Sequence, residues 1–351
     1  MSKNLHTLET SRSIHETSIN DDQDIILEVN NLKTYFKLDE GMLKAVDGVD
    51  FQLKKGRTLG IVGESGSGKS VTTKAVLQIV DTPGQVEGEI KFRSSKTGEI
   101  VDIGKLHPKG KVVRDIRGGE ISMIFQEPMK AFSPIHTIGN QLVEAILLHD
   151  TKDEKEARKI AIDTLKKVGM SNPEQRIDQY PHELSGGMRQ RAMIAMALCC
   201  NPSILIADEP TTALDVTVQA QVLDLINNLK ENSGSAVIFI THDLGVIAEM
   251  ADEVAVMYLG KVVEYTDVDT LFFGALHPYT QGLLNSIPTI GMKNQRLESI
   301  EGTVPTPINL PKGCGFYTRC KKAVDGVCNV EDIPMTKIKE GHYVRCALVE
   351  R

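Results

Sequence analysis

"GESGSGKS" (Gly63–Ser70) is the stretch of this sequence that decides the fold. It fits the pattern G-x-x-x-x-G-K-[S/T], in which glycines let the backbone turn and point successive N–H groups at phosphate oxygens. The apolar run Thr58–Val62 before it is typical of a buried strand, and residues 70–80 after it are typical of a helix. The N-terminus of that helix adds positive potential. The sequence therefore predicts a phosphate-binding loop between a strand and a helix.

Individual side chains of this loop have separate predicted roles. Lys69 is long enough to reach the β- and γ-phosphates of a nucleotide, and the Ser70 hydroxyl can ligate Mg²⁺. Thr72 is placed to contact the α-phosphate. The residues expected to bind nucleotide here are Gly63, Ser65, Gly66, Ser67, Gly68, Lys69, Ser70 and Thr72.

A second motif, "ILIADEP" (Ile204–Pro210), is an apolar strand that ends in two carboxylates. Asp208, at the end of the strand, can hold Mg²⁺ through water, and Glu209 can orient or deprotonate an attacking water. A strand that ends in a solvated acidic turn has the same pattern, so the motif by itself is weak. Together with the phosphate loop it predicts a nucleotide hydrolase that uses ATP and Mg²⁺.

Apolar strands alternate with helices along most of the chain, which predicts an α/β sheet covered on both faces. Residues 153–169 have the pattern of an amphipathic helix, and we expect Thr151 and Glu154 to form a capping box at its start. Beyond about Leu271 the sequence is rich in Pro and Gly and indicates a separate, loop-rich C-terminal module. The expected strands are 25–29, 43–53, 58–62, 120–125, 203–208, 236–240 and 253–259, and the expected helices are 70–80, 153–169, 188–200, 216–230 and 244–250.

Composition limits the class of protein. The 351 residues are 41% hydrophobic, which predicts a packed core. Their net charge of −7 argues against a protein that binds mainly to nucleic-acid phosphates. The longest apolar run, Ala192–Cys200, is far shorter than the roughly 20 residues that span a bilayer. Residues 1–24 are polar, without an apolar stretch of signal-peptide length, and we expect a mobile tail and a cytoplasmic protein.

"LSGGMRQR" (Leu184–Arg191) resembles the signature of ATP-binding-cassette (ABC) ATPases, and other parts follow in the order of that family. Gln126 in "MIFQEP" resembles its Q-loop, "TTALDVT" its D-loop with Asp215, and His242 in "FITHD" its switch histidine. The resemblance covers about 25–265. It implies an ABC-type P-loop NTPase domain over 25–270, with a mixed-sheet core, an antiparallel β subdomain and a helical subdomain at about 127–200.

The resemblance also implies roles for particular residues. Glu209 and His242 are the expected catalytic pair, and His242 would contact the γ-phosphate and orient Glu209 or the water. Phe36 in "LKTYF" would stack on adenine, with Tyr35 as the alternative. Met188 stands where the family has Gln, and none of the implied contacts uses that side chain. Ser70, Gln126 and Asp208 are the implied ligands of Mg²⁺. Ser185, Gly186 and Gly187 would act on the nucleotide bound by a facing subunit.

"HPYTQGLLNSIP" and "IEGTVPTPINLPKGCGFYTRC" resemble the ATPase subunits of oligopeptide and dipeptide importers, whose relatives also import nickel or oligosaccharides. This implies an ATP-hydrolysing importer subunit on the inner face of the cell membrane. Its implied partners are a second, different ABC ATPase chain, two transmembrane permease subunits and, indirectly, an extracellular substrate-binding protein. A soluble ABC ATPase acting on nucleic acid, or an exporter subunit, is the alternative. We expect no nucleic-acid partner.

Four cysteines, Cys314, Cys320, Cys328 and Cys346, crowd the C-terminal segment with the spacing C-x5-C-x7-C-x17-C. Buried free thiols, a zinc site and a four-iron four-sulfur cluster all accommodate this spacing, although the paired C-x₂₋₄-C of most zinc sites is absent. The resemblance implies the iron–sulfur cluster within 271–351. Neighbouring cations are expected to lower the thiol pKa values; they are Arg319, Lys321, Lys322 and Arg345. Cys199 and Cys200 are expected to be core residues.

Overall fold

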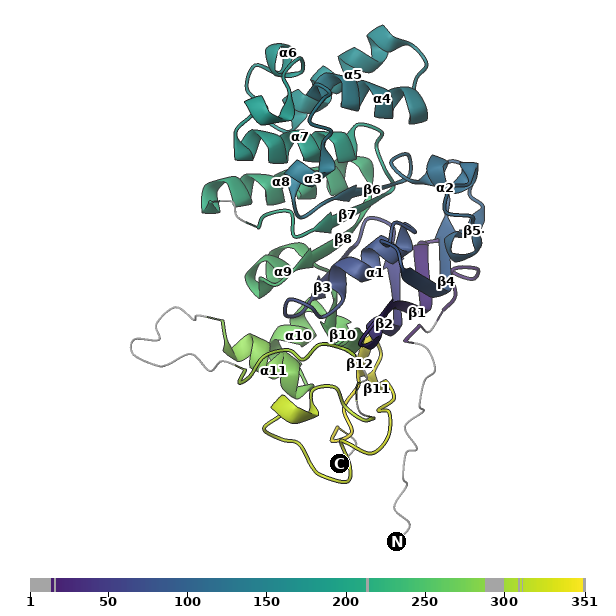
Figure 1. Ribbon diagram of the computed structural model, residues 1–351, viewed down its shortest axis with the longest axis vertical. Coiled ribbons are helices and arrows are strands. Elements are labelled where there is room, and N and C mark those ends of the chain that lie inside the picture. The colour runs from purple at the N-terminus through teal and green to yellow at the C-terminus, as the bar shows by residue number, and fades with distance from the viewer. Residues whose placement is uncertain are drawn as a thin grey trace.

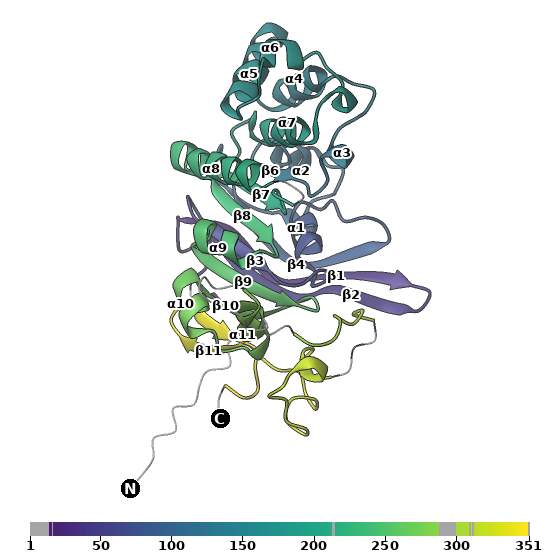
Figure 2. The ribbon, with the colours of Figure 1, turned by 90° about the vertical axis from the view of Figure 1, so that its left-hand side faces the viewer.

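The computed structural model describes residues 14–15, 17–212, 215–287, 300–308, 310 and 312–349. Two sheets organise the chain (Figures 1 and 2). The larger has the strand order β11-β12-β10-β9-β3-β8-β7-β6, and the smaller, antiparallel sheet has the order β2-β1-β4-β5. The strands are β1 Ile25–Leu38, β2 Gly41–Lys54, β3 Thr58–Val62, β4 Gly84–Arg93, β5 Ile100–Asp102, β6 Ile121–Ile124, β7 Ile204–Asp208, β8 Ala236–Thr241, β9 Glu253–Tyr258, β10 Lys261–Asp267, β11 Thr336–Lys339 and β12 His342–Val344.

The larger sheet is mixed, as predicted. Strands β6, β7, β8, β3 and β9 run parallel, and β10, β12 and β11 follow at the β9 edge, each antiparallel to the strand before it. Every residue of β3, β7 and β8 is buried. Strands that are apolar along their whole length need cover on both faces, which helices supply on one side and the antiparallel sheet on the other. The mixed sheet and the antiparallel sheet of the cassette are therefore both present.

Helices α4, α5, α6 and α7 form a layer beyond the end of β6 (Figure 1). Their apolar residues, such as Leu142, Ala161 and Ile194, belong to one buried cluster with the sheet. The helices are α1 Lys69–Val76, α2 Lys111–Ile116, α3 Pro128–Ala131, α4 Ile138–His149, α5 Glu154–Lys167, α6 Pro173–Arg176, α7 Gly186–Leu198, α8 Val216–Ser233, α9 Leu244–Met250, α10 Val268–Gly274 and α11 Pro278–Asn285, with 3₁₀ turns at Ile103–Lys105, Pro181–Glu183 and Tyr317–Arg319. None of the helices in the described part of the chain is both long and apolar enough to cross a bilayer.

The start of α5 differs from the prediction. The cap is Asp153, whose carboxylate accepts hydrogen bonds from the N–H groups of Lys155 and Glu156 at 2.8 and 3.1 Å. Thr151 instead donates its hydroxyl to the Glu156 carboxylate at 2.6 Å. The expected Thr151–Glu154 capping box is therefore wrong, because Asp153 directly precedes the first helical residue and its short side chain reaches the free N–H groups. Helix α1 also ends at Val76 rather than at 80.

The expected mobile tail over 1–24 does not extend to residue 24. Ile19 is fully buried against the antiparallel sheet. Its N–H donates to the Glu28 carboxylate at 2.7 Å, and the Gln52 amide donates to the carbonyl of Thr17 at 2.7 Å. This packing occurs because buried polar groups on β1 and β2 need partners that the segment's backbone supplies. Residues 1–13 and 16 lie outside the described residues.

The C-terminal segment has little regular structure, but it is joined to the main sheet. Strand β12 pairs antiparallel with β10, placing Glu264 opposite Val344. The fully buried Glu264 carboxylate accepts the N–H groups of Leu276 and His277 and lies 2.8 Å from Nε2 of His342. The segment expected to form a separate module thus shares a sheet with the cassette, because the backbone of β10 has an edge that β12 fills.

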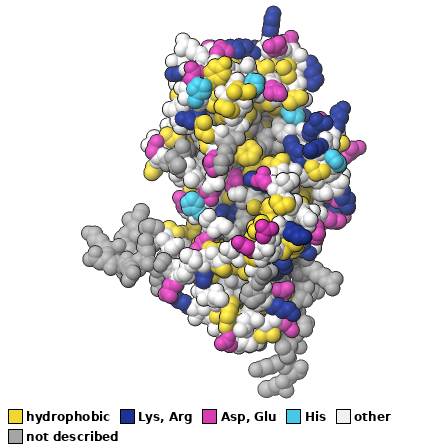
Figure 3. Space-filling model, in the orientation of Figure 1, with side chains coloured by type: hydrophobic (Ala, Val, Ile, Leu, Met, Phe, Trp, Pro, Cys, Tyr) yellow, Lys and Arg dark blue, Asp and Glu magenta, His cyan; other side chains and the backbone are white. Residues whose placement is uncertain are grey.

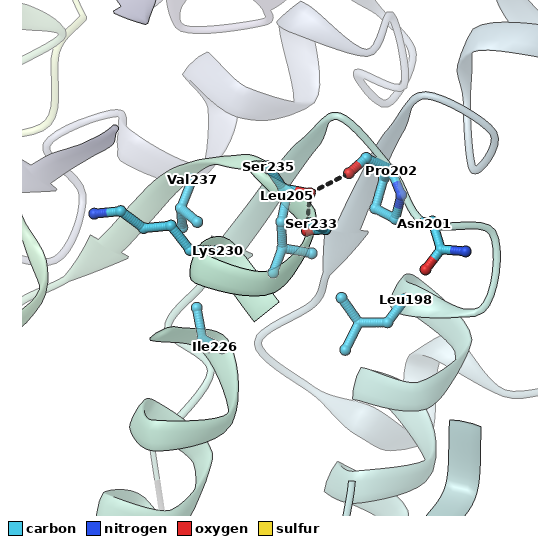
Figure 4. Close-up of a pocket in the computed structure, with 9 residues that line it drawn as sticks. All are labelled: Leu198, Asn201, Pro202, Leu205, Ile226, Lys230, Ser233, Ser235 and Val237. Atoms are coloured by element: carbon cyan, nitrogen blue, oxygen red, sulfur yellow. Dashed lines mark hydrogen bonds between the residues drawn. The ribbon is translucent and has the colours of Figure 1, made fainter. Parts of the chain in front are cut away.

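Two surface features lie away from the phosphate loop. Figure 4 shows a small cavity between the end of α7, helix α8 and strands β7 and β8, where Ser235 donates to the carbonyl of Pro202 at 2.6 Å. Its lining is mostly aliphatic, so we regard it as a packing feature. Lys and Arg side chains gather beside α2 (Figure 3), although the chain is acidic as a whole. The exposed cations here are Lys105, Lys109, Lys111 and Arg114.

Candidate nucleotide site

The phosphate loop lies between β3 and α1, as predicted. Gly63, Gly66 and Gly68 all have positive φ, at 153°, 83° and 100°. An added Cβ at Gly63 would lie 2.2 Å from the carbonyl oxygen of Met257, and one at Gly68 would lie 2.3 Å from that of Ala45. Only glycine fits at these two points, because the loop turns tightly against the neighbouring backbone.

Lys69 is the first residue of α1, and its ammonium group turns back over the loop. Its Nζ donates to the carbonyls of Gly63 at 2.7 Å and of Glu64 at 3.1 Å. Burial lowers the pKa of Lys69, although the charges of Glu209, Asp208 and Glu64 oppose this shift. A desolvated ammonium held by carbonyls alone is suited to an anionic ligand, since phosphate oxygens supply the charge that it lacks.

Ser70 and Asp208 meet at the end of the parallel strands. The Ser70 hydroxyl donates to Oδ1 of Asp208 at 2.9 Å. Asp208 is 3% exposed, and burial raises its pKa, while the hydrogen bond from Ser70 lowers it. Burial disfavours the ionised form of the Asp208 carboxylate. A divalent cation bound beside this carboxylate and the Ser70 hydroxyl would stabilise the ionised form. The residues needed for Mg²⁺ are therefore adjacent, and their chemistry fits that ion.

Glu209 is the centre of a second hydrogen-bonded group. Nε2 of Gln126 donates to its Oε2 at 2.9 Å, and Nδ1 of His242 lies 3.4 Å from its Oε1. The hydroxyl of Thr212, which the sequence analysis did not single out, donates to Oε2 at 3.0 Å. Glu209 also has a positive φ of 47°, an unusual conformation for a non-glycine residue that clusters at functional sites. Gln126, Glu209 and His242 are thus brought together.

The remaining loop residues support this arrangement or lie beside it. Thr72 is fully buried, and its hydroxyl donates to the carbonyl of Gly68 at 3.0 Å. The buried Ser67 hydroxyl has no hydrogen-bond partner among the described residues. Ser65 and Gly66 lie at the outer turn of the loop, where a Cβ on Gly66 would meet nothing within 4 Å.

The two aromatic candidates for adenine have different surroundings. Phe36 is half-buried on β1, opposite Leu43 of β2 and Gly84 of β4, and its ring lies close enough to Gly84 that an added Cβ there would be 2.7 Å away. The Tyr35 hydroxyl donates to the Asp47 carboxylate. The Tyr35 ring therefore already has a polar partner, whereas Phe36 has only packing contacts.

The signature residues lie at the start of α7, in the helical layer rather than at the phosphate loop (Figures 1 and 2). Ser185 is the N-cap of α7, accepting from the N–H of Met188 at 3.3 Å. A Cβ on Gly186 or Gly187 would meet nothing within 4 Å. Asp215 caps α8, accepting from the N–H of Val218 at 3.0 Å. Both helix starts are exposed, so their N–H groups are accessible to a ligand or to another chain.

The comparisons with known proteins agree with this geometry. The family described as ABC transporter matches residues 46–212, and the family described as oligopeptide/dipeptide transporter, C-terminal region, matches residues 263–328. The oligopeptide transport ATP-binding protein AppD of Bacillus subtilis is 50% identical over 93% of this chain and 97% of its own length. This chain belongs to the ATP-binding proteins of the ABC transporter family.

Other relatives of this ABC protein give the same result. The dipeptide transport ATP-binding protein DppD of Escherichia coli is 42% identical over 92% of this chain and 96% of its own length. Among solved structures, the dimeric ABC transporter cassette MJ0796 has a TM-score of 0.61 at 26% identity, covering 69% of this chain and all but 1% of the other. A post-hydrolysis state of MJ0796 bound to ADP and Pi has a TM-score of 0.60.

The C-terminal segment of this ABC protein brings its four cysteines together. Cys314, Cys320, Cys328 and Cys346 all line one cavity, together with His277. Cys346 lies two residues after the end of β12, and the pairing of β12 with β10 brings it to the other three. Within the described ranges, no three or more His, Cys, Asp or Glu side chains form a group that could hold a metal ion. The observation that supports a metal or a cluster at these thiols is the cavity that all four line.

The expectation that nearby cations lower the thiol pKa values is wrong for three of the cysteines. Burial raises the pKa of Cys314 to about 11, and burial also raises the pKa values of Cys320 and Cys346. The cations have other partners: Arg319 binds Glu64 and Arg345 donates to backbone carbonyls. Lys322 lowers the pKa of Cys320, and its effect is smaller than that of burial.

Cys199 and Cys200 lie at the end of α7, apart from the four C-terminal thiols. Cys199 is buried, and its sulfur lies 3.7 Å from that of Cys200. The Cys200 thiol points to the carbonyl of Ala145 on α4 at 3.6 Å. These contacts agree with the prediction that both are packing residues of the helical layer.

Proposed function

We propose that this chain is the ATP-hydrolysing subunit that powers an importer of dipeptides or oligopeptides. The single observation that carries the proposal is the placement of Glu209. It is held by Gln126 and His242 one residue after Asp208, and Asp208 is hydrogen-bonded to Ser70 of the phosphate loop. Phosphoryl transfer to water needs positioning and charge stabilisation, and this arrangement can supply both.

In this proposal each residue has one task. The loop backbone and Lys69 bind the β- and γ-phosphates of ATP, and Thr72 lies near the α-phosphate. Ser70, Asp208 and Gln126 hold Mg²⁺, directly or through water, and the ion would neutralise charge on the phosphates. Glu209 orients or deprotonates the attacking water, and His242, whose side chain is 61% exposed, is free to turn to the γ-phosphate.

The catalytic site is proposed to need a second cassette. Ser185, Gly186 and Gly187 are exposed or half-exposed at the N-terminus of a 13-residue helix, whose N–H groups and dipole favour an anion. They lie in a different layer from the phosphate loop of their own chain, so they would act on the nucleotide of a facing subunit. Asp215, exposed at the start of α8, would lie at the same interface. The facing cassette is proposed to be a different chain.

The proposed permease contact is an apolar groove between the helical layer and the sheet. Its lining includes Met123 and Phe125 of the β6 end, Leu148 of α4 and Met196 of α7. Leu148 is 64% exposed, which is unusual for a large apolar side chain without a partner. Because Phe125 adjoins Gln126, an element seated here could move the amide that holds Glu209. In this proposal two permease subunits, and indirectly an extracellular binding protein, act with the chain at the inner membrane face.

The four thiols are proposed to hold a four-iron four-sulfur cluster that stabilises the C-terminal segment. The support is the shared cavity of Cys314, Cys320, Cys328 and Cys346. Thiolates are the usual ligands of such clusters, and a four-iron cluster separates its cysteine sulfurs more widely than one zinc ion, whose ligand sulfurs are about 4 Å apart. The cluster would supply cross-links between loops that have little regular structure of their own. Zinc is the alternative occupant.

The test of the transport function is ATP turnover by the chain assembled with its permease and partner ATPase in vesicles. Peptide-loaded binding protein should stimulate turnover severalfold, and the Glu209→Gln assembly should show no stimulation. Stimulation by nickel-loaded or oligosaccharide-loaded binding protein, with none by peptides, would replace the proposed substrate class. An isolated chain that turns over ATP as fast as the assembly, or one stimulated by nucleic acid, would contradict the importer itself.

A further inference from the structure

Arg319, from the cysteine-rich segment, contacts the phosphate loop directly. Its guanidinium forms a two-pronged ion pair with the Glu64 carboxylate, with Nη1–Oε2 at 2.7 Å and Nη2–Oε1 at 3.0 Å. The other donors are satisfied by the carbonyls of Glu301 and Gly302 at 2.9 and 3.1 Å and by the Tyr258 hydroxyl at 3.4 Å. The side chain is 5% exposed. A buried guanidinium with all its donors used is a fixed structural element.

Glu64 occupies the second position of the phosphate loop and is held from two sides. Its N–H donates to the Tyr279 hydroxyl at 2.8 Å, and its carbonyl accepts from the Lys69 ammonium at 3.1 Å. Tyr279 is itself fully buried on α11, where it packs against Tyr258 and Phe316 with ring centroids 4.7 and 5.3 Å away. The first turn of the loop therefore rests on residues from outside the nucleotide-binding motifs.

The charge of Glu64 makes this contact important for nucleotide binding. A carboxylate in a loop that must bind phosphates would repel them, because like charges at short range repel more strongly where water is partly excluded. The same carboxylate attracts Lys69, as its charge acts on that ammonium. An unpaired Glu64 would therefore compete with the phosphates for Lys69 and weaken their binding.

We propose that Arg319 and Tyr279 are positioning residues for the nucleotide site: Arg319 neutralises the Glu64 carboxylate, and Tyr279 fixes the backbone of the loop. The C-terminal segment is then part of what makes the phosphate loop competent, in addition to any role of its thiols. Neither residue would touch the nucleotide. The inference rests on the proposed assignment of Gly63–Ser70 as the phosphate site.

The test is binding of a fluorescent ATP analogue with Mg²⁺ to the full chain, for wild type and a set of charge variants. We expect Arg319→Gln to raise the dissociation constant about tenfold, and the double variant with Glu64→Gln to return it to within about threefold of wild type. The defect of Arg319→Gln should shrink as KCl is raised, because salt screens the repulsion. In the assembled transporter, KM for ATP should rise more than kcat falls. A purely structural role predicts no rescue by Glu64→Gln.

Matched controls separate this effect from general damage. Arg158→Gln removes another arginine–carboxylate ion pair, in which Nη2 alone donates to both carboxylate oxygens of Asp178 on the exposed helical layer, and should leave the dissociation constant within about twofold of wild type. If Arg319→Gln does not fold, Tyr279→Phe provides the second variant, with binding expected to be about threefold weaker. Tyr317→Phe, which removes the hydroxyl of a half-buried tyrosine that donates to Asp325 in the same segment, is its control.

Three outcomes overturn the inference. Arg319→Gln and Tyr279→Phe could both bind as tightly as wild type, or the double variant could bind no better than Arg319→Gln alone. In either case Lys69→Ala, which should abolish binding, would show that the phosphate site itself is correctly assigned. If Lys69→Ala bound the analogue like wild type, the proposed site would fail, and the inference with it.

Discussion

The phosphate loop and the cysteine-rich segment are both glycine-containing loops attached to the same sheet, yet they are assembled in different ways. The loop Gly63–Ser70 is one continuous stretch, and its partners come from the ends of neighbouring parallel strands, β7 and β8. The four thiols come from loops, and Cys346 joins the others only because β12 pairs with β10. Adjacent parallel strands bring their carboxyl ends together automatically, whereas loops depend on particular contacts.

The two regions also differ in how charge is handled. At the phosphate loop, buried Lys69 and Asp208 have shifted pKa values that a bound nucleotide and its cation would relieve. At Cys314, Cys320 and Cys346, burial raises the thiol pKa values, and two of the nearby cations, Arg319 and Arg345, are hydrogen-bonded to other partners. The regions meet at the Glu64–Arg319 ion pair. The comparison teaches that the second region supports the first through one contact, and each prediction below tests one side of it.

The largest expected effect is on catalysis at the phosphate side. Glu209→Gln should lower kcat of the assembled transporter by about 100-fold to 1,000-fold, because it removes the base while keeping the shape of the side chain. Binding of Mg²⁺ and ATP should remain within a few-fold of wild type. Steady-state phosphate release and nucleotide titration measure the two quantities. Glu249→Gln, at an exposed carboxylate of α9, is the matched control, and equal losses in both variants would contradict the role of Glu209.

The second effect tests the thiol side. Cys320→Ser should reduce bound iron from about four per chain to below one, because the cluster loses a ligand. Anaerobic purification followed by metal analysis and a visible spectrum provides the measurement. Cys200→Ser, a half-buried thiol at the end of α7, should keep the full iron content. Colourless wild-type protein with one zinc per chain would replace iron with zinc, and equal iron in both variants would remove Cys320 from the site.

The third effect concerns the attachment of the C-terminal segment to the main sheet and depends on pH. Burial by itself raises the pKa of Glu264, but the hydrogen bonds from His342 and the backbone outweigh it, so the pKa lies below its ordinary value of 4.5. The ionised form is thus favoured in the folded state. Its stabilisation is present above about pH 4.5 and is lost as the pH falls through the lowered value.

Thermal melts followed by circular dichroism measure this effect, since the chain has no tryptophan for fluorescence. Glu264→Gln should lower stability at pH 7 by about 2 kcal/mol and reduce the loss of stability below pH 4.5. Glu340→Gln, in the exposed turn between β11 and β12, should change neither. An unchanged acid dependence in Glu264→Gln would show that this carboxylate does not anchor β12.

The smallest expected effect separates the two aromatic residues on β1. Phe36→Ala should weaken ATP binding about fivefold, through loss of aromatic stacking, and Phe36→Tyr should retain most of it. Tyr35→Ala should have a smaller effect, because the Tyr35 hydroxyl is engaged by Asp47. Nucleotide titration of the three variants decides between them. The reverse order would transfer the adenine contact to Tyr35.

The sequence by itself determined the parts of this protein that depend on short-range geometry. A strand, a glycine-rich turn and a helix follow directly from residues 58–76, because glycine alone tolerates the positive φ values and close contacts of the loop. The apolar runs of β7 and β8 indicated buried strands, with Asp208 and Glu209 at the end of the first, whereas His242 was implied by the resemblance to ABC ATPases. These features needed only patterns within a few residues of one another.

Only the tertiary structure decided which distant groups meet. It placed Asp153 rather than Thr151 at the cap of α5, packed Ile19 on the antiparallel sheet and joined β12 to β10. It also paired Arg319 with Glu64, two residues that the sequence does not link. An arginine 255 positions from its carboxylate leaves no local pattern. Its partner is chosen by burial, because a desolvated guanidinium must find acceptors wherever the folded chain provides them.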